Sequence, residues 1–260
     1  MGLILCEHKS IDNPLYIEDI GLNIYSLEEL CYVIYNYPYT SLDGLVKENF
    51  MYFINNELSL PVHGDSIDDL LVSILNFSDY YSSQEVEKFR SVIQNIRKLP
   101  KCDFYKNKGD CFFKAGKYGK AKTMYDAALK EASYQNTDAL VYGRIYHNYG
   151  AASANLFEYD SAYEAYTKAY SYLQDASILK SIYFLAKQQP VIGKREKYLK
   201  YLNDRVEPDW DQEYENVLTD SYSGKAIEDF DSGLNKDSVK KKTFLTDKLE
   251  NLKSEYRLMV

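Results

Sequence analysis

Apolar residues recur every three or four positions along most of this 260-residue chain, which is the spacing of helices that bury one face. In the first hundred residues this spacing predicts four helices. The first begins after Ser26 and the second spans about 42–58. The third and fourth occupy DSIDDLLVSILNF (65–77) and SSQEVEKFRSVIQNIRKL (82–99). Few Pro and Gly residues interrupt the pattern, six and 12 in all, which favours a helical fold over a turn-rich β architecture.

Helix starts are marked by capping residues. Ser26 and Ser82 each stand three residues before a Glu, which is the spacing of a capping box, and the third helix has Asp65 or Ser66 as its cap. Two short stretches, GLILC (2–6) and IGLNIY (20–25), have strand character, so a small β-hairpin at the start of the chain is an open alternative to helix there.

After Pro100 the pattern changes to pairs of helices, because Pro disfavours helix at the residue before it. The first pair is predicted over 103–114 and on to 134, and the second over 138–156 and 159–173. A further helix is expected over 176–189, with the basic stretch 194–206 as its partner. We therefore expect three regions: an acidic helical segment (1–100), a set of helical hairpins (101–205) and C-terminal capping helices (206–260).

The two hairpins are internal repeats. GKYGKAKTMYDAAL (116–129) is echoed by FEYDSAYEAYTKAY (157–170), and the matching positions share a constant offset of 41 residues. The matched residues of the first pair are Tyr105, Gly109, Phe112, Ala121, Tyr125 and Ala128; those of the second are Tyr146, Gly150, Ser153, Ala162, Tyr166 and Ala169. Small residues at such spacings let two helix backbones approach closely, while the aromatic rings fill the space between neighbouring hairpins.

On these residues the chain resembles the tetratricopeptide repeat family over 102–174, and more weakly to about 205. The sequence departs from the family pattern in several places: Tyr replaces its Trp, Lys108 and Tyr149 replace its Leu, and Ser153 replaces an aromatic residue. The offset also exceeds the usual repeat of 34 residues by seven, about two helical turns. We expect the helix that opens the second pair to contain this extension.

The resemblance implies an all-α array whose first helices line a groove for a peptide or protein segment. The groove-facing candidates are Lys106, Asp110, Phe113, Arg144, His147, Asn148 and Asn155. Lys106 and Asn148 match part of the family's clamp for a peptide carboxylate, but Asp110 stands where the clamp needs Asn and would repel such a group. A basic or mixed-charge segment suits Asp110 better. The alternative is a solvated face without a ligand.

Charge is unevenly spread along the chain. Residues 1–100 contain six basic and 15 acidic side chains, a net charge of −9, whereas the remainder contains 25 and 24. Because nucleic acid recognition needs a basic surface, this balance argues against a nucleic acid partner. It also argues against the alternative interpretation, a peptide-sensing bacterial transcription regulator, because such a regulator needs a basic helix-turn-helix near the start. The 27 Tyr reflect either codon usage in an AT-rich genome or a Tyr-rich recognition surface.

The last 23 residues, SVKKKTFLTDKLENLKSEYRLMV (238–260), repeat apolar residues at alternating spacings of four and three, as in a coiled coil. The repeated residues are Leu245, Leu249, Leu252, Tyr256 and Met259. Two heptads are short for a coiled coil, so this segment is expected to cap the array within a monomer, with homodimerisation as the alternative.

No enzyme motif is complete. GDCFFKAGKY (109–118) has six residues where a phosphate loop has four, and Tyr118 stands where the loop needs Ser or Thr. Cys111 and His147 form a conceivable thiol and base pair on neighbouring first helices. Cys6 with His8 resembles only a fragment of a metal site. We therefore expect a protein without catalytic activity, metal or cofactor.

No apolar run reaches the length of a membrane span. The start, MGLILC, is too short and lacks the basic residues of a signal peptide, and Cys6 replaces the Ser or Thr of a myristoylation signal at Gly2. The four cysteines form no CxxC pair and are expected to be reduced thiols. The overall expectation is a cytoplasmic, all-helical adaptor for a protein partner.

Overall fold

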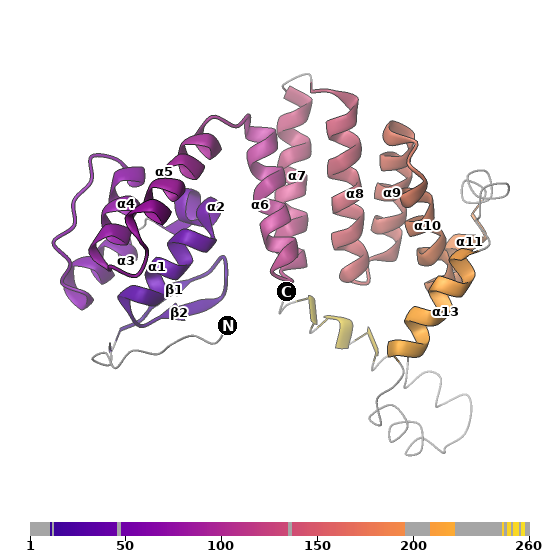
Figure 1. The fold of residues 1–260 in the computed structure, drawn as a ribbon. Helices are drawn as coiled ribbons and strands as arrows, with labels where there is room; N and C mark the ends of the chain where they lie inside the picture. Colours follow the sequence, from indigo (N-terminus) through magenta and orange to yellow (C-terminus); the bar gives the residue numbers. More distant parts are fainter. Residues whose placement is uncertain are drawn as a thin grey trace, which may run out of the picture. The chain divides into compact units, whose positions relative to one another are not determined.

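The computed structural model describes residues 11, 13–45, 48–134, 137–195 and 209–221, and near the end of the chain residues 246, 249–250, 252–254 and 256–257. The chain divides into two compact units, Met1–Cys111 and Phe112–Val260, and the division falls inside helix α6 (Lys101–Lys114). Helices dominate both units (Figure 1), which confirms the all-α prediction.

A β-hairpin opens the first unit. Strand β1 (Leu15–Ile17) pairs antiparallel with β2 (Leu22–Ile24), with Tyr16 opposite Asn23. The turn between them contains Gly21 at φ +66°, a left-handed conformation that favours Gly. The second predicted strand segment therefore contains β2, whereas GLILC lies outside the described residues.

The predicted caps specify where the helices of this unit begin. Helix α1 (Leu27–Asn36) begins after Ser26, whose hydroxyl accepts from the Glu29 amide; the Glu29 carboxylate accepts from the amide of Tyr25 rather than that of Ser26, so the predicted box is only half formed. Helix α5 (Ser83–Arg97) has the complete box between Ser82 and Glu85. The cap of α4 (Ile67–Phe77) is Ser66, not Asp65.

The predicted helix over 42–58 is a broken run instead. It consists of α2 (Pro38–Thr40), the π-helical turn η1 (Ser41–Leu45), α3 (Glu48–Tyr52) and a second π-helical turn η2 (Phe53–Glu57). The wider π turns bring Leu45, Phe50, Phe53 and Ile54 together into the core of the unit, whereas a regular helix would spread them differently around its axis. Sequence periodicity does not register such turns.

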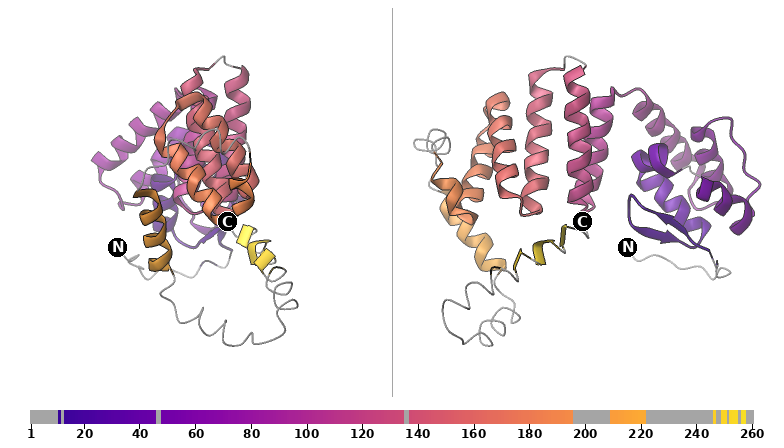
Figure 2. Two further views of the ribbon diagram at one scale, coloured as in Figure 1. Left: turned by 90° about the vertical axis from the view of Figure 1, so that its right-hand side faces the viewer. Right: turned by 180° about the vertical axis from the view of Figure 1, so that it is seen from behind.

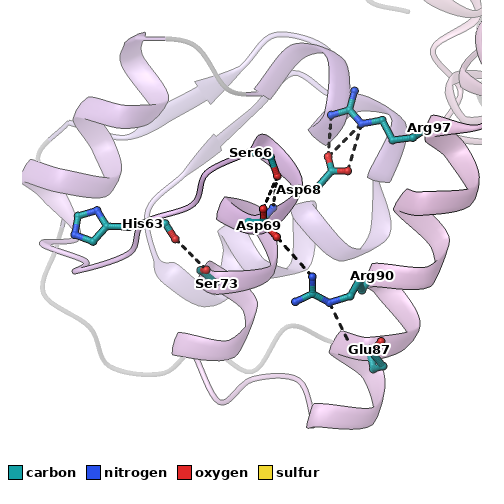
Figure 3. Close-up of polar contacts among 8 residues, drawn as sticks. All are labelled: His63, Ser66, Asp68, Asp69, Ser73, Glu87, Arg90 and Arg97. Atoms are coloured by element: carbon teal, nitrogen blue, oxygen red, sulfur yellow. Dashed lines mark hydrogen bonds and ion pairs between the residues drawn. The ribbon is translucent and has the colours of Figure 1, made fainter.

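Polar contacts fasten α4 to α5 at the surface of the first unit (Figure 3). Asp68 pairs with Arg97 at 2.8 Å, and Asp69 lies 3.6 Å from Arg90. Beneath them the predicted stripe of α5, Val86, Phe89, Ile93 and Ile96, is buried against α1 and α4 residues. Burial of this stripe, rather than the exposed ion pairs, supplies most of the stabilisation here.

The second unit is a row of helices that stand side by side in chain order (Figures 1 and 2). Helix α7 packs on α8, α8 on α9 and α9 on α10. Their bounds are α7 (Tyr118–Tyr134), α8 (Ala139–Asn155), α9 (Tyr159–Leu173) and α10 (Ala176–Gln188), followed by the short α11 (Pro190–Gly193). Each of the four longer helices lies where the apolar spacing predicts one.

The repeat residues lie at the contacts between these helices. Ala121, Ala128, Ala162 and Ala169 have no solvent exposure, and the rings of Tyr125 and Tyr166 are buried beside them. A Cβ added to Gly150 would meet the Tyr166 ring at 2.8 Å, and one added to Gly143 would meet the Leu173 side chain at 2.4 Å. Glycine is therefore needed at both positions of α8, because the facing side chains of α9 leave no room even for a methyl group.

Both hairpin turns close with the same two hydrogen bonds. In the first turn the Gly116 amide donates to Phe113 (3.0 Å) and the Lys117 amide donates to Phe112 (2.9 Å). In the second, Phe157 donates to Ala154 (3.0 Å) and Glu158 donates to Ser153 (2.9 Å). The donors and acceptors of the second turn lie 41 residues after those of the first, so the sequence repeat is also a repeat of backbone geometry.

The seven extra residues of the repeat are not confined to the helix that opens the second pair. Helix α8 has 17 residues against 14 in α6, which accounts for only part of the excess. Helix α7, also with 17 residues against 15 in α9, contains another part. The extension is shared because α7 and α8 pack along each other and lengthen together.

Helix α13 (Asp209–Ser221) covers the outer side of α10. Trp210 is buried against the Tyr183 ring, with the ring centres 5.7 Å apart. The Tyr183 hydroxyl donates to Asp211 at 2.6 Å, and the Lys187 ammonium lies 2.5 Å from the same carboxylate. The basic stretch predicted as the partner of α10 (194–206) lies mostly outside the described residues. The described partner of α10 on this side is α13, which lies further along the chain.

Candidate functional site

One side of α8 presents a row of mostly polar residues. Arg144, Asn148, Ala151 and Asn155 are spaced by four, three and four positions, which places them on one face of the helix. Arg144 and Asn155 are exposed, and the two residues between them are half-buried. The other side of the helix packs into the array through Gly143, Ile145, Gly150, Ala152 and Ser153. This row, which we call the α8 face, contains three of the predicted groove residues.

His147 lies beside this face but turns toward the array. Its ring is half-buried and lies 5.8 Å from the Tyr166 ring of α9. Burial lowers the pKa of His147 below its ordinary value, while the nearby Asp175 carboxylate partly opposes this effect. Asp175 also caps α10 by accepting from the Ser177 amide at 2.8 Å. The His147 ring therefore packs against α9 and interacts electrostatically with the carboxylate that caps α10.

A cluster of aromatic rings adjoins the α8 face. Tyr172 of α9 stacks on Tyr142 (5.8 Å) and on Tyr146 (6.2 Å), both from α8, and the Lys168 ammonium lies 5.1 Å above the Tyr146 ring. Burial raises the pKa of Tyr146, and the neighbouring Tyr172 and Asp126 add to this shift. We call Tyr142, Tyr146, Tyr172 and Lys168 the tyrosine cluster.

The tyrosine cluster was not among the predicted groove residues, although Tyr146 was predicted as a packing residue. A sequence signal for it exists: Tyr142 and Tyr146 are one helical turn apart, and so are Lys168 and Tyr172. The spacing alone does not say that the two turns meet. Because Tyr172 remains partly exposed, the cluster offers aromatic contact area at the surface of the second unit.

Two of the predicted groove residues in the second unit are engaged locally. The Asn155 side-chain amide donates to the Ala151 carbonyl of its own helix at 2.9 Å. Phe113 packs edge to face on Tyr118, with the ring centres 5.2 Å apart, and is half-buried. Both side chains are thus held by contacts with their own or the neighbouring helix.

Lys106 and Asp110 belong to the first unit. Their side chains are one helical turn apart on α6 and form an ion pair at 2.6 Å, with about a quarter of each side chain exposed. The pair is close to neutral as a whole, so Asp110 presents a compensated rather than an isolated negative charge. The structure places the remaining groove residues, Phe113, Arg144, His147, Asn148 and Asn155, in the second unit.

Lys108, which stands where the repeat family has Leu, is used within the first unit. Its side chain is almost fully buried, and its ammonium lies 2.7 Å from Asp43 in η1 and 3.3 Å from Asp19 in the β-hairpin turn. A buried ammonium is tolerated only when it is paired in this way. The departure from the family pattern therefore ties α6 to the acidic N-terminal unit.

The thiol and the imidazole of the predicted pair belong to different units. Cys111 ends the first unit and His147 belongs to the second. Cys31 is buried in the first unit, where burial raises the pKa of its thiol to about 11 and keeps it protonated. Within the described ranges no three His, Cys, Asp or Glu side chains are grouped as a metal site would require. Among those same residues, no helix is both long and apolar enough to cross a bilayer.

The chain was compared with family models, curated proteins and solved structures. None of the three comparisons found a match. The assignment of function therefore rests on the geometry of the two units and on the resemblance to the tetratricopeptide repeat family.

Proposed function

We propose that this protein is a non-catalytic adaptor of the tetratricopeptide repeat type, which binds a peptide or protein segment along its helical hairpins. The observation that carries the proposal is the repeated hairpin geometry. Two turns with identical hydrogen bonds are followed by helices whose alanines are fully buried. Arrays of this kind present one face of their first helices as an extended binding surface.

The α8 face and the tyrosine cluster supply the chemistry for recognising a segment. Arg144 and Asn148 offer hydrogen-bond donors to backbone carbonyls or acidic side chains, and the tyrosines offer flat apolar area with a polar tip. In the first unit, Asp110 beside Lys106 favours a partner of mixed charge over a uniformly acidic one. The surface of the second unit, taken by itself, therefore suits a protein segment with hydrogen-bond acceptors or acidic side chains and at least one aromatic or aliphatic anchor.

The proposal is tested by selecting binders from a library of random linear peptides and measuring their affinity by fluorescence anisotropy. Asn148→Leu is expected to weaken selected peptides by about tenfold, because a polar group of the peptide loses its partner. Arg144→Glu is expected to weaken them several-fold and to make binding less dependent on acidic peptide residues.

Lys130→Glu is the matched control for Arg144→Glu, because it makes the same charge change at an exposed position of α7 outside both surfaces. It is expected to leave the affinities unchanged. If no peptides are selected, or if all selected peptides bind Asn148→Leu and Arg144→Glu as tightly as the original protein, the α8 face is not the binding surface.

A further inference from the structure

The turn between α8 and α9 is contacted by the far end of the chain. Residues 249–250, 252–254 and 256–257, here called the C-terminal segment, are helical, and three of them lie against this turn. The Tyr256 ring lies 5.7 Å from the Phe157 ring, and the Lys253 ammonium lies 5.9 Å from the rings of both Phe157 and Tyr159. A segment a hundred residues away in sequence thus covers an aromatic pair.

Arg257 completes the end of helix α8. Its guanidinium donates to the carbonyl of Leu156, the C-cap residue, at 2.5 Å and to the carbonyl of Phe157 at 3.1 Å. The last carbonyls of a helix have no partner within the helix and carry its negative dipole end. Because the Arg257 guanidinium donates two hydrogen bonds there, it recognises the helix terminus specifically rather than making a general surface contact.

Phe157 has an unusual backbone for a bulky residue. It adopts φ +58°, and the matching residue of the first turn is Gly116 at φ +73°. Gly is the residue that takes this conformation without strain, so an aromatic side chain at the same position is retained against a conformational cost. The ring is 37% exposed and is oriented toward Tyr256 and Lys253. The strained residue is therefore the one that the C-terminal segment contacts.

A pocket of about 540 Å³ lies beside this contact. Its wall combines the α8–α9 turn with residues near α11 and with Glu250 and Lys253 of the C-terminal segment. Its lining includes three ion pairs: Lys122 with Glu158, Arg195 with Asp160, and Lys253 with Glu250. One wall of the hollow is thus contributed by the chain's own end.

We propose that the α8–α9 turn is a peptide-docking surface whose resident occupant is the chain's own C-terminal segment. The recognition elements are a Lys, an aromatic residue and an Arg at helical positions i, i+3 and i+4, as in Lys253, Tyr256 and Arg257. The α8 face plays no part in this contact, so the inference does not rest on the adaptor function proposed above.

Two described leucines of the C-terminal segment remain about half exposed. Leu249 and Leu252 belong to the seam predicted from the sequence, yet they are 51% and 49% exposed. Leu245 and Met259 lie outside the described residues. Among the described residues, the segment is thus held by Lys253, Tyr256 and Arg257 rather than by its two described leucines, which is why a Lys, aromatic and Arg signature defines the occupant.

The test uses a fluorescent synthetic peptide of residues 245–260 and the full chain. In the tail variant, Tyr256→Ala/Arg257→Ala, the resident segment is weakened and the turn becomes accessible. We expect the peptide to bind this variant, and to bind the original protein at least about tenfold more weakly, because a tethered segment competes at high effective concentration.

Adding Phe157→Gly to the tail variant is expected to abolish peptide binding while the turn still folds, since Gly holds the same position in the first hairpin. Adding Tyr134→Ala, at a highly exposed tyrosine on α7, should leave peptide binding unchanged. The proposal is overturned if the tail variant does not bind the peptide, if the original protein binds it equally well, or if Phe157→Gly has no effect.

Discussion

Phe157 occupies the left-handed backbone position that Gly116 holds 41 residues earlier, at φ +58° against +73°. The two turns share two backbone hydrogen bonds, and the second has an aromatic side chain where the first has none. No atom lies within 4 Å of a Cβ built on Gly116, so that turn has room for a side chain and none is present. The second turn has an aromatic ring at this position, which is where the chain's end docks.

The cost of that conformation is measurable. Phe157→Gly should be more stable than Phe157→Ala by about 0.5–1 kcal/mol, because both lose the ring but only Ala keeps a Cβ in the left-handed region. Gly116→Ala should lose a similar amount in the first turn, where no steric contact contributes. Urea unfolding of the three variants gives these differences. Equal stability of Phe157→Gly and Phe157→Ala would show that the turn is unstrained.

The close packing of the hairpins should resist larger side chains. Ala121→Leu and Ala162→Leu are each expected to destabilise the protein by roughly 1–3 kcal/mol, because both alanines are fully buried at helix contacts. Ala139→Leu at the exposed start of α8 is the control and should change little. Thermal and urea unfolding followed by circular dichroism measure the effect. Tolerance of Leu at both buried positions would contradict the repeat packing.

Reversing one charge on α6 should separate binding from stability. Asp110→Lys places two lysines one turn apart and should cost only about 0.2–0.5 kcal/mol, since the pair is partly exposed. It should nevertheless weaken peptides whose basic residues face Asp110. Anisotropy with the selected peptides and urea unfolding measure the two effects.

The double variant Lys106→Glu/Asp110→Lys restores an ion pair of opposite polarity and therefore controls for stability. Its unfolding midpoint should return to that of the original protein, while its peptide affinity should stay reduced. Recovery of both properties together would assign Asp110 a structural role only.

Acidification should release α13 from α10. Hydrogen bonds from Lys187 and Tyr183 hold the pKa of Asp211 below its ordinary value of 3.8. A carboxyl group whose pKa is lowered in the folded state stabilises that state above its unfolded pKa, and this stabilisation is lost as the pH falls through the folded pKa. We therefore expect the contact to weaken below about pH 4.

Trp210, the only Trp in the chain, reports this step because it is buried against Tyr183. Its fluorescence should shift to the red at acidic pH. In Asp211→Asn the shift should already be present in part at neutral pH and should depend less on pH. Asp209→Asn, a neighbouring exposed carboxylate in the same helical turn, serves as the control. An unchanged pH profile in Asp211→Asn would remove Asp211 from this role.

Much of the architecture follows from short-range patterns. Ser66 and Ser82 specify where α4 and α5 begin, because a cap acts on amides two or three residues away. The buried faces of α7 and α9 follow from the spacing of Ala121 and Ala162 with their tyrosines. The positions of Arg144 and Asn148 on one face of α8 are likewise a consequence of helical periodicity.

The helices, most of their ends and the repeated hairpin follow from the residue pattern, because each depends on residues a few positions apart. Tertiary packing sets the π-helical turns before Leu58, the pairing of Lys108 with Asp19 and Asp43, and the contact of Tyr172 with Tyr146. It also decided that Arg257 reaches Leu156. These contacts join faces of different elements, and which faces meet depends on the packing of the whole unit, which no local spacing records.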